Sequence, residues 1–160
     1  MRLSDNVKLA QSDLVLAAAT TFTTDTNVVD LSNYRRVRAI LTLNQAGAGT
    51  GTVTLKQSAT ADGSDEKALT FAGYLKNETG VTSDDLTAVA ATTLTTAGPT
   101  TGQNTYIFEI QSSELDVANA FRYVRMDVTG ISNNTAASLR YELYDPRYTC
   151  GAEDMPVAIA

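Results

Sequence analysis

The amino-acid sequence predicts an all-β protein, namely a single-domain antiparallel β-sandwich of about eight strands with a jelly-roll-like arrangement. Three observations lead to this fold class. Apolar and polar residues alternate in several segments of strand length, and clusters of Gly, Asn, Asp and Pro separate these segments. The segments are rich in Thr, Val, Ile and Tyr, whose side chains suit a pleated surface. The clearest strand, residues 34–43, has an echo at residues 121–128, and in both an Arg-X-Val-Arg pattern follows an aromatic residue.

The size and composition of the chain fit one globular domain that covers residues 1–160. No apolar run approaches the roughly 18 residues that a membrane-spanning helix needs. We therefore expect no membrane partner, and the net charge of −6, which opposes attraction to a phosphate backbone, predicts that nucleic acid is no partner either. The single cysteine, Cys150, and the polar start of the sequence predict synthesis in the cytoplasm.

The expected elements follow from periodicity and turn residues. Residues 1–11 have no strong period and predict an extended N-terminal arm, and residues 147–160 predict a C-terminal arm. The glycine-rich residues 44–51 predict a hairpin between two neighbouring strands. Residues 113–120 predict a short helical turn with a serine cap. Strands are expected at residues 14–24, 26–31, 34–43, 52–58, 68–72, 86–96, 105–111, 121–128 and 138–144.

The alternation also predicts which face of each strand meets the core. In the echo strand, Tyr123, Arg125 and Asp127 are expected to point outward. The residues expected on the core side are Val37, Ala39, Leu41, Leu43, Val53, Leu55, Leu69, Phe71, Tyr106, Phe108, Ile110, Val124, Met126, Val128, Leu139, Tyr141 and Leu143.

The residue types offer little for catalysis. The chain contains no His, which is the commonest general base and metal ligand. Glu109 and Glu142 would face each other if their strands were suitably placed, as the two carboxylates of a glycosidase do. Carboxylates are nevertheless common on strand surfaces, and a carboxylate-dependent hydrolase is the least favoured hypothesis. We therefore expect a protein that is not an enzyme and that uses no cofactor.

One acidic loop has the ligands of a metal site. Asp62–Glu66 offers the oxygen atoms that Ca²⁺ favours, but it lacks the EF-hand spacing. A turn between two strands explains the same residues, so no metal is expected there.

Five arginines on expected outer faces are the candidate interface residues: Arg36, Arg38, Arg122, Arg125 and Arg140. If the two echo strands were neighbours, these guanidinium groups would line one sheet face beside Glu109, Asp127 and Glu142. The simpler interpretation is a ladder of cross-strand ion pairs, which contributes little at a wet surface. The alternative is a contact surface for an acidic neighbouring subunit, because Arg is enriched at interfaces.

The apolar end of the sequence is a second candidate for contacts. Val157 and Ile159 would gain little by staying exposed, so we expect this segment to pack. It would pack either on its own sandwich or on a neighbour as an added strand.

The order of these features resembles a family of small β-sandwich proteins of tailed bacteriophages and prophages. The resemblance rests on the strand opening Tyr34-Arg35-Arg36-Val37, residues 51–63, the following Lys67-Ala68-Leu69, and the late strand opening at residues 121–125. It spans about residues 34–144. The family comprises auxiliary head proteins, typically capsid decoration or cement proteins, and it has no catalytic signature to carry over.

This resemblance implies a structural role in the virion. It implies binding to the assembled major capsid protein on the capsid surface, and self-association as a homo-oligomer, such as a trimer. Clamping neighbouring subunits would stabilise the assembled lattice by mass action. The alternative is a tail-associated or host-facing adhesion module on the same sandwich. That alternative predicts an exposed pocket in the loops at residues 45–51 and 98–104.

Overall fold

The computed structural model describes residues 7–15, 21–23, 28–45, 50–78, 85–92, 94–97, 102–129 and 134–148. Nearly all of the regular structure in these ranges is β, so the predicted fold class is confirmed. The strands are β1 (Val7–Val15), β2 (Thr21–Thr23), β3 (Val29–Asp30), β4 (Tyr34–Gln45), β5 (Thr50–Ser58), β6 (Lys67–Ala68), β7 (Tyr74–Asn77), β8 (Thr87–Val89), β9 (Leu94–Ala97), β10 (Gly102–Gln111), β11 (Tyr123–Thr129) and β12 (Asn134–Pro146). Two 3₁₀ helices, η2 (Ser112–Glu114) and η3 (Val117–Asn119), form the helical turn predicted at residues 113–120. The predicted serine cap is wrong, because η2 is capped by Gln111 and η3 by Asp116.

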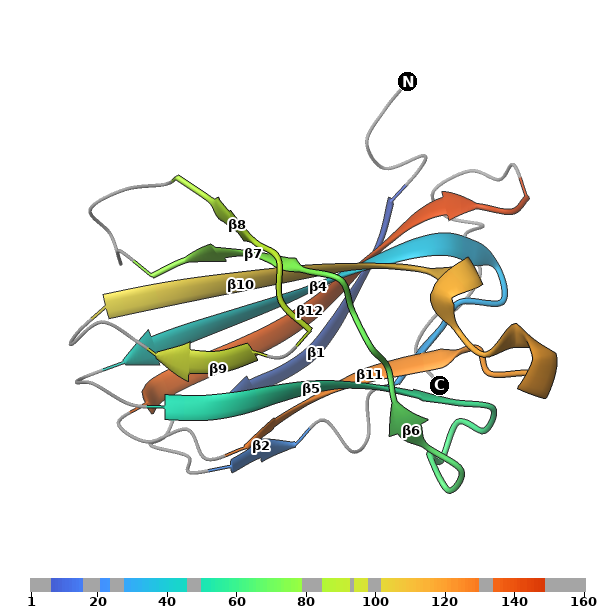
Figure 1. Ribbon diagram of the computed structural model, residues 1–160, viewed down its shortest axis with the longest axis horizontal. Coiled ribbons are helices and arrows are strands. Elements are labelled where there is room, and N and C mark those ends of the chain that lie inside the picture. The colour runs from blue at the N-terminus through green and yellow to red at the C-terminus, as the bar shows by residue number, and fades with distance from the viewer. Residues whose placement is uncertain are drawn as a thin grey trace.

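The strands form two antiparallel sheets that pack face to face (Figure 1). Sheet A has the order β1-β12-β4-β10-β7-β8, and sheet B has the order β2-β11-β5-β6. In addition, β3 pairs with β11, and β9 pairs with β5. From β4 onward, successive long strands change sheet, since β4, β10 and β12 lie in sheet A and β5 and β11 lie in sheet B. This crossing between sheets is the arrangement expected of a jelly-roll sandwich.

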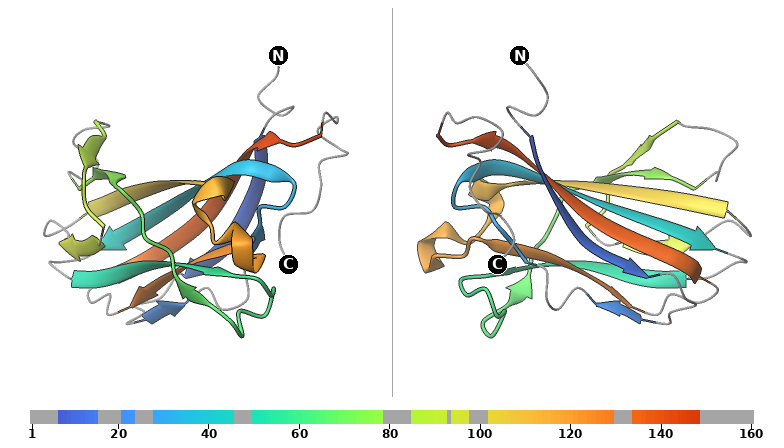
Figure 2. Two further views of the ribbon diagram at one scale, coloured as in Figure 1. Left: turned by 45° about the vertical axis from the view of Figure 1, so that its right-hand side comes forward. Right: turned by 180° about the vertical axis from the view of Figure 1, so that it is seen from behind.

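The predicted hairpin around residues 44–51 is wrong. β4 pairs with β10 and β12 in sheet A, whereas β5 pairs with β11, β6 and β9 in sheet B. The two strands therefore lie on opposite sides of the core (Figure 2). Their alternation requires only that each apolar face meets the core, and two strands in different sheets satisfy this as well as a hairpin does.

Two expected long strands are each divided between the sheets. Residues 86–96 contain β8 in sheet A and β9 in sheet B. Residues 14–24 contain the end of β1 in sheet A and β2 in sheet B. Ala and Thr dominate both segments, so their apolar period is too weak to locate a change of sheet.

Part of the expected N-terminal arm is a β-strand. Residues 7–11 form the first part of β1, which pairs with β12 from Val7 opposite Tyr144 to Gln11 opposite Arg140. Backbone hydrogen bonds to an edge strand need no apolar alternation, which explains why the pattern of this segment is weak. Residues 1–6 lie outside the described residues, as do residues 149–160 of the expected C-terminal arm.

The core lies between the sheets and contains every residue assigned to it from the alternation. The faces of β11 are less clear-cut than predicted. Tyr123 and Asp127, both expected on the outside, are only 7% exposed. For Asp127, the reason is an ion-pair cluster on the outer face of sheet B, described below.

Candidate interaction surfaces on the two sheets

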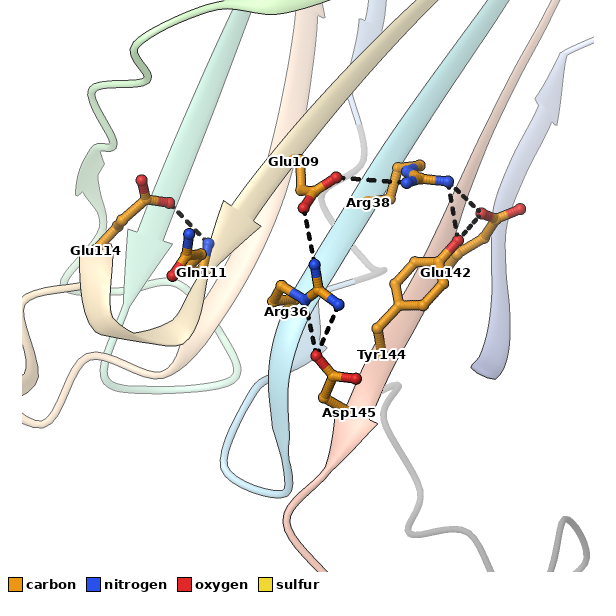
Figure 3. A network of polar contacts seen from close by, with 8 residues as sticks. All are labelled: Arg36, Arg38, Glu109, Gln111, Glu114, Glu142, Tyr144 and Asp145. Atoms are coloured by element: carbon orange, nitrogen blue, oxygen red, sulfur yellow. Dashed lines mark hydrogen bonds and ion pairs between the residues drawn. The ribbon is translucent and has the colours of Figure 1, made fainter. Parts of the chain in front are cut away.

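The outer face of sheet A carries a ladder of charged side chains centred on Arg38 (Figure 3). Arg38 lies on β4, between Glu109 on β10 and Glu142 on β12 in the strand register. Its Nη2 lies 3.4 Å from Glu109 Oε2, and its Nη1 lies 3.8 Å from Glu142 Oε2. The two glutamates are therefore two strands apart, with a cation between them. Glu142 also pairs with Arg140, at 3.5 Å.

Tyr144 fixes one side of this ladder. Its hydroxyl donates to Glu142 Oε2 at 2.6 Å and accepts from Arg38 Nη1 at 3.1 Å. The guanidinium of Arg38 also lies over the Tyr144 ring, 5.1 Å from its centroid. Partial burial and the bond to Glu142 raise the pKa of Tyr144, although Arg38 acts in the opposite direction. The phenol therefore stays protonated as a donor.

Arg36 extends the ladder by one step along β4. Its Nε donates to Asp145 Oδ2 at 2.8 Å, and its Nη1 lies 3.3 Å from Glu109 Oε1. The hydrogen bond with Asp145 is the main cause that raises the pKa of Arg36. Asp145 has a positive φ of 52°, which Asp tolerates better than most residues. Glu109 thus bridges both arginines of β4.

The ion pairs of the ladder hold charged side chains in place on the surface but contribute little to the free energy of folding. The side chains of Arg36, Arg38 and Glu109 are 42%, 37% and 47% exposed. Ion pairs with this degree of solvent exposure typically contribute about 0.2–1 kcal/mol each to the free energy of folding. The cross-strand ion-pair ladder predicted from sequence is thus present for Arg36 and Arg38, whereas Arg140 pairs with Glu142 along its own strand. The energetic consequence is small, but the positions of the charged groups are fixed relative to the sheet.

An apolar depression of about 410 Å³ adjoins the ladder on the same sheet. Arg38 and Glu109 line one part of it, and most of the remaining lining comes from β7, β8 and β10. Leu75 is 37% exposed there and lies directly opposite Ile107 in the register. Sequence reasoning missed this feature, because β7 and β8 are too short to show a period. The complete lining is Arg38, Ala72, Gly73, Tyr74, Leu75, Ala88, Val89, Ala90, Ile107 and Glu109.

Sheet B carries a separate cluster on its outer face. Arg125 is paired with Glu66 and lies 3.5 Å, Nε to Oδ1, from Asp127. Lys56 pairs with both acids, at 2.6 Å from Glu66 Oε1. The side chains of Arg125 and Asp127 are only 11% and 9% exposed, so this cluster is drier than the ladder of sheet A. Desolvation lowers the pKa of Lys56, but the bonds to Asp127 and Glu66 outweigh it and raise the pKa overall.

The acidic loop uses its carboxylates within the fold. Glu66 belongs to the cluster of sheet B, and Asp65 accepts from the backbone N–H groups of Ala59 and Thr60 at 3.1 and 3.3 Å. Asp62 accepts from the Ser64 N–H at 3.1 Å. Across the described residues, no three His, Cys, Asp or Glu side chains gather as metal ligands. The geometry of Asp62–Glu66 is that of a hydrogen-bonded turn.

The five candidate arginines fall on two faces. Arg36, Arg38 and Arg140 lie in sheet A, whereas Arg125 lies in sheet B on β11. Arg122 precedes β11 and lies 3.8 Å from Asp30, and it donates to the Tyr123 hydroxyl at 2.8 Å. The two echo strands lie in different sheets and are not neighbours, so the five arginines do not line one sheet face.

Two other candidates fall largely on undescribed residues. Val157 and Ile159 lie outside the described residues. The adhesion alternative depends on the loops at residues 45–51 and 98–104, of which residues 46–49 and 98–101 are also undescribed.

The comparisons with known proteins leave the family open. No family model matches the chain, and no curated protein matches it. Among solved structures, the SPBc2 prophage-derived protein YomS has a TM-score of 0.46 at 8% identity, covering 88% of this chain and 94% of that chain. The CBM22-2 xylan-binding domain of Paenibacillus barcinonensis Xyn10C has a TM-score of 0.35 at 8% identity, covering 88% and 92%. These values are too low to assign a family. No helix among the described residues is long and apolar enough to span a membrane.

Proposed function

We propose that this protein is a structural virion protein of a bacteriophage or prophage, which decorates the assembled major capsid lattice and stabilises it. The observation that carries this proposal is the outer face of sheet A. There, an exposed apolar depression lies directly beside a fixed array of charged side chains, on a sheet of six strands. The resemblance of the strand and turn pattern to auxiliary head proteins supplies the class of partner.

This face has the composition of a protein interface. Apolar side chains such as Leu75 and Ile107 form the part that a partner would desolvate. Arg and Tyr, both enriched at interfaces, are present as Arg38, which lines the depression, and Tyr144, which contacts Arg38. Because the ladder holds Arg38 in place before binding, a partner would lose little side-chain entropy at this residue.

The proposed mechanism is mechanical. A protein that binds neighbouring capsid subunits only in the assembled shell lowers the free energy of that shell relative to free subunits. Many weak contacts arranged symmetrically give high avidity if the protein itself is a homo-oligomer, for which we propose a trimer. No bond is made or broken in this role, and no cofactor takes part.

Co-sedimentation tests the proposal. Shells are assembled from the major capsid protein encoded in the same genome, and the purified protein is added before centrifugation. Depletion of the wild-type protein from solution is expected. Leu75→Glu, which places a charge in the depression, should abolish depletion, whereas Thr52→Glu adds the same charge to the exposed side of sheet B and should leave it unchanged. Failure of the wild type to sediment with shells would overturn the proposal.

A further inference from the structure

A groove lined by arginines lies at the end of the sandwich where η2 and η3 connect the sheets (Figure 1). It consists of two depressions of about 490 and 260 Å³, which adjoin because Ser112, Val117 and Arg147 line both. We call their union the end groove. It shares no lining residue with the apolar depression of sheet A, so it is a separate site.

The lining of the end groove is cationic, although the whole chain has a net charge of −6. A single carboxylate, that of Asp145, lines it beside four arginines: Arg35, Arg36, Arg122 and Arg147. Arg36 pairs with Asp145 and Glu109, and Arg122 lies 3.8 Å from Asp30. In the parts of the chain that the structure describes, no carboxylate lies at ion-pair distance from Arg35 or Arg147. These two guanidinium groups are therefore available to an anionic ligand.

The strand register places the backbones of these two arginines at the same end of neighbouring strands. Tyr34 on β4 pairs with Pro146 on β12, and each of the two arginines follows one member of this pair. The Arg147 N–H donates to the Asn33 carbonyl at 2.8 Å, and Arg147 Nη2 donates to Ser112 Oγ at 3.1 Å. This side chain is thus held in position before a ligand arrives, which reduces the side-chain entropy lost on binding.

The other part of the end groove is apolar. Leu31 and Leu115 form its buried lining, at 1% and 5% exposure. Val117 is 65% exposed and lines both depressions, so it adjoins the cationic part as well as the apolar part. An apolar side chain of a ligand would cover Val117 and remove apolar surface from water. A ligand that fits the whole groove therefore carries negative charge and an apolar group close together.

We propose that the end groove binds a short acidic segment of a partner protein, in which carboxylates flank an apolar side chain. The carboxylates pair with Arg35 and Arg147, whose planar guanidinium groups suit bidentate contacts, and the apolar side chain covers Val117. A small inorganic anion would leave the apolar part uncovered. The net charge of −6 opposes a long polyanion such as nucleic acid, whereas a short segment confines its charges to the groove. This site goes beyond the proposed capsid role and does not depend on it.

An NMR titration of the full chain with synthetic peptides tests the proposal. The probe is the capped peptide Glu-Glu-Glu-Leu-Glu-Glu-Glu, and two control peptides carry Ser in place of Leu or Lys in place of Glu. We expect the acidic probe to shift the backbone amide signals of Arg35, Ser113 and Val117 and to leave Thr129, at the far end of β11, unchanged. The peptide with Ser should bind severalfold more weakly, and the peptide with Lys should not bind. Added salt should weaken binding of the probe, because it screens the ion pairs.

Substitutions in the groove identify the contacts. Arg35→Glu should weaken binding of the acidic probe severalfold, and Val117→Ser should remove the preference for the peptide with Leu. Both positions are exposed, so neither change removes a core side chain. Arg140→Glu makes the same charge change outside the groove and should leave the affinity unchanged. Undiminished binding by Arg35→Glu, or no shift of the groove signals in the wild type, would overturn the proposal.

Three further results would rule out this occupant. If inorganic phosphate shifted the same signals with the affinity of the probe, the groove would be a site for a small anion. If the groove signals moved with protein concentration in the absence of peptide, a second copy of the chain would be the occupant. If the variant Glu153→Gln with Asp154→Asn bound the probe severalfold more tightly than the wild type, the acidic residues of the chain itself would be competing for the groove.

Discussion

The hydroxyl oxygen of Tyr141 accepts a hydrogen bond of 2.9 Å from the backbone N–H of Met126. Tyr141 belongs to β12 in sheet A, and Met126 belongs to β11 in sheet B. The bond lies where β11 passes from pairing with β3, at residues 123–124, to pairing with β2, at residues 127–129. A core side chain of sheet A thus bonds to the backbone of sheet B at a residue of β11 that pairs with neither of the short strands β2 and β3.

Removing this hydroxyl should weaken the contact between the sheets. Tyr141→Phe keeps the ring, which is 1% exposed, and deletes only the acceptor. We expect the free energy of unfolding to fall by about 1 kcal/mol, the usual net contribution of one hydrogen bond. Urea unfolding measures it, with Tyr144→Phe as a partly exposed control. An unchanged midpoint would show that the bond contributes nothing.

The two ion-pair clusters should differ in their effect on stability. Asp127→Ala removes one of the two acids that Arg125 and Lys56 share among the described residues, in a cluster where the Arg125 side chain is 11% exposed. We expect a loss of about 3 kcal/mol, because removing one partner from a largely buried ion-pair cluster is strongly destabilising. Denaturant unfolding is the measurement. A loss below that of an exposed surface pair would contradict the burial of this cluster.

The ladder of sheet A should behave in the opposite way. Arg38→Ala is expected to change the free energy of unfolding by about 1 kcal/mol or less, because its ion pairs are solvated. A double-mutant cycle of Arg38→Ala with Glu109→Ala isolates the pair, and its coupling energy should shrink as salt is added. A large coupling energy that is insensitive to salt would show that this face is drier than its exposure indicates.

The turn of the acidic loop should loosen in acid. Burial alone would raise the pKa of Asp65, but bonds from Thr60 and Ala59 outweigh it and lower the pKa below the ordinary 3.8. The folded state therefore binds this proton less readily than the unfolded state. Its stabilising contribution is present above pH 3.8 and is lost as the pH falls through the lowered folded pKa. Amide hydrogen exchange at Ala59 should show protection lost over that range, and Asp65→Asn should lose it at neutral pH.

Gly73 should be intolerant of a side chain. A Cβ at this position would lie 2.6 Å from the Val89 carbonyl oxygen, on the backbone of β8. Gly73→Ala should therefore displace β8 from β7 at a cost of about 1–3 kcal/mol. The chemical shifts of Val89 and Leu75 would report it. Ala72→Ser, at the exposed neighbouring position, serves as control and should leave both signals in place.

The sequence predicted which face of a strand meets the core better than it predicted which strands pair with one another. Alternation placed Val37 and Leu41 in the core and Arg36 and Arg38 outside, because the direction of a strand side chain has a period of two. It carries no information on which strand pairs with which. The partners of Arg38 therefore emerged only from the register with β10 and β12. The apolar depression was missed because β7 and β8 are too short to show a period, and because alternation does not reveal that Leu75 lies opposite Ile107.

The alternation of consecutive long strands between the sheets has a consequence for synthesis. β4 and β5 leave the ribosome early, but β4 pairs with β10 and β12, and the longest ladder of β5 is with β11. Sheet B cannot be completed until the chain has been made to about residue 129, and sheet A not until about residue 146. We infer that the nascent chain stays unfolded until that point and that the domain then forms in one cooperative, comparatively slow step. Such a chain exposes its strands to aggregation until it is released.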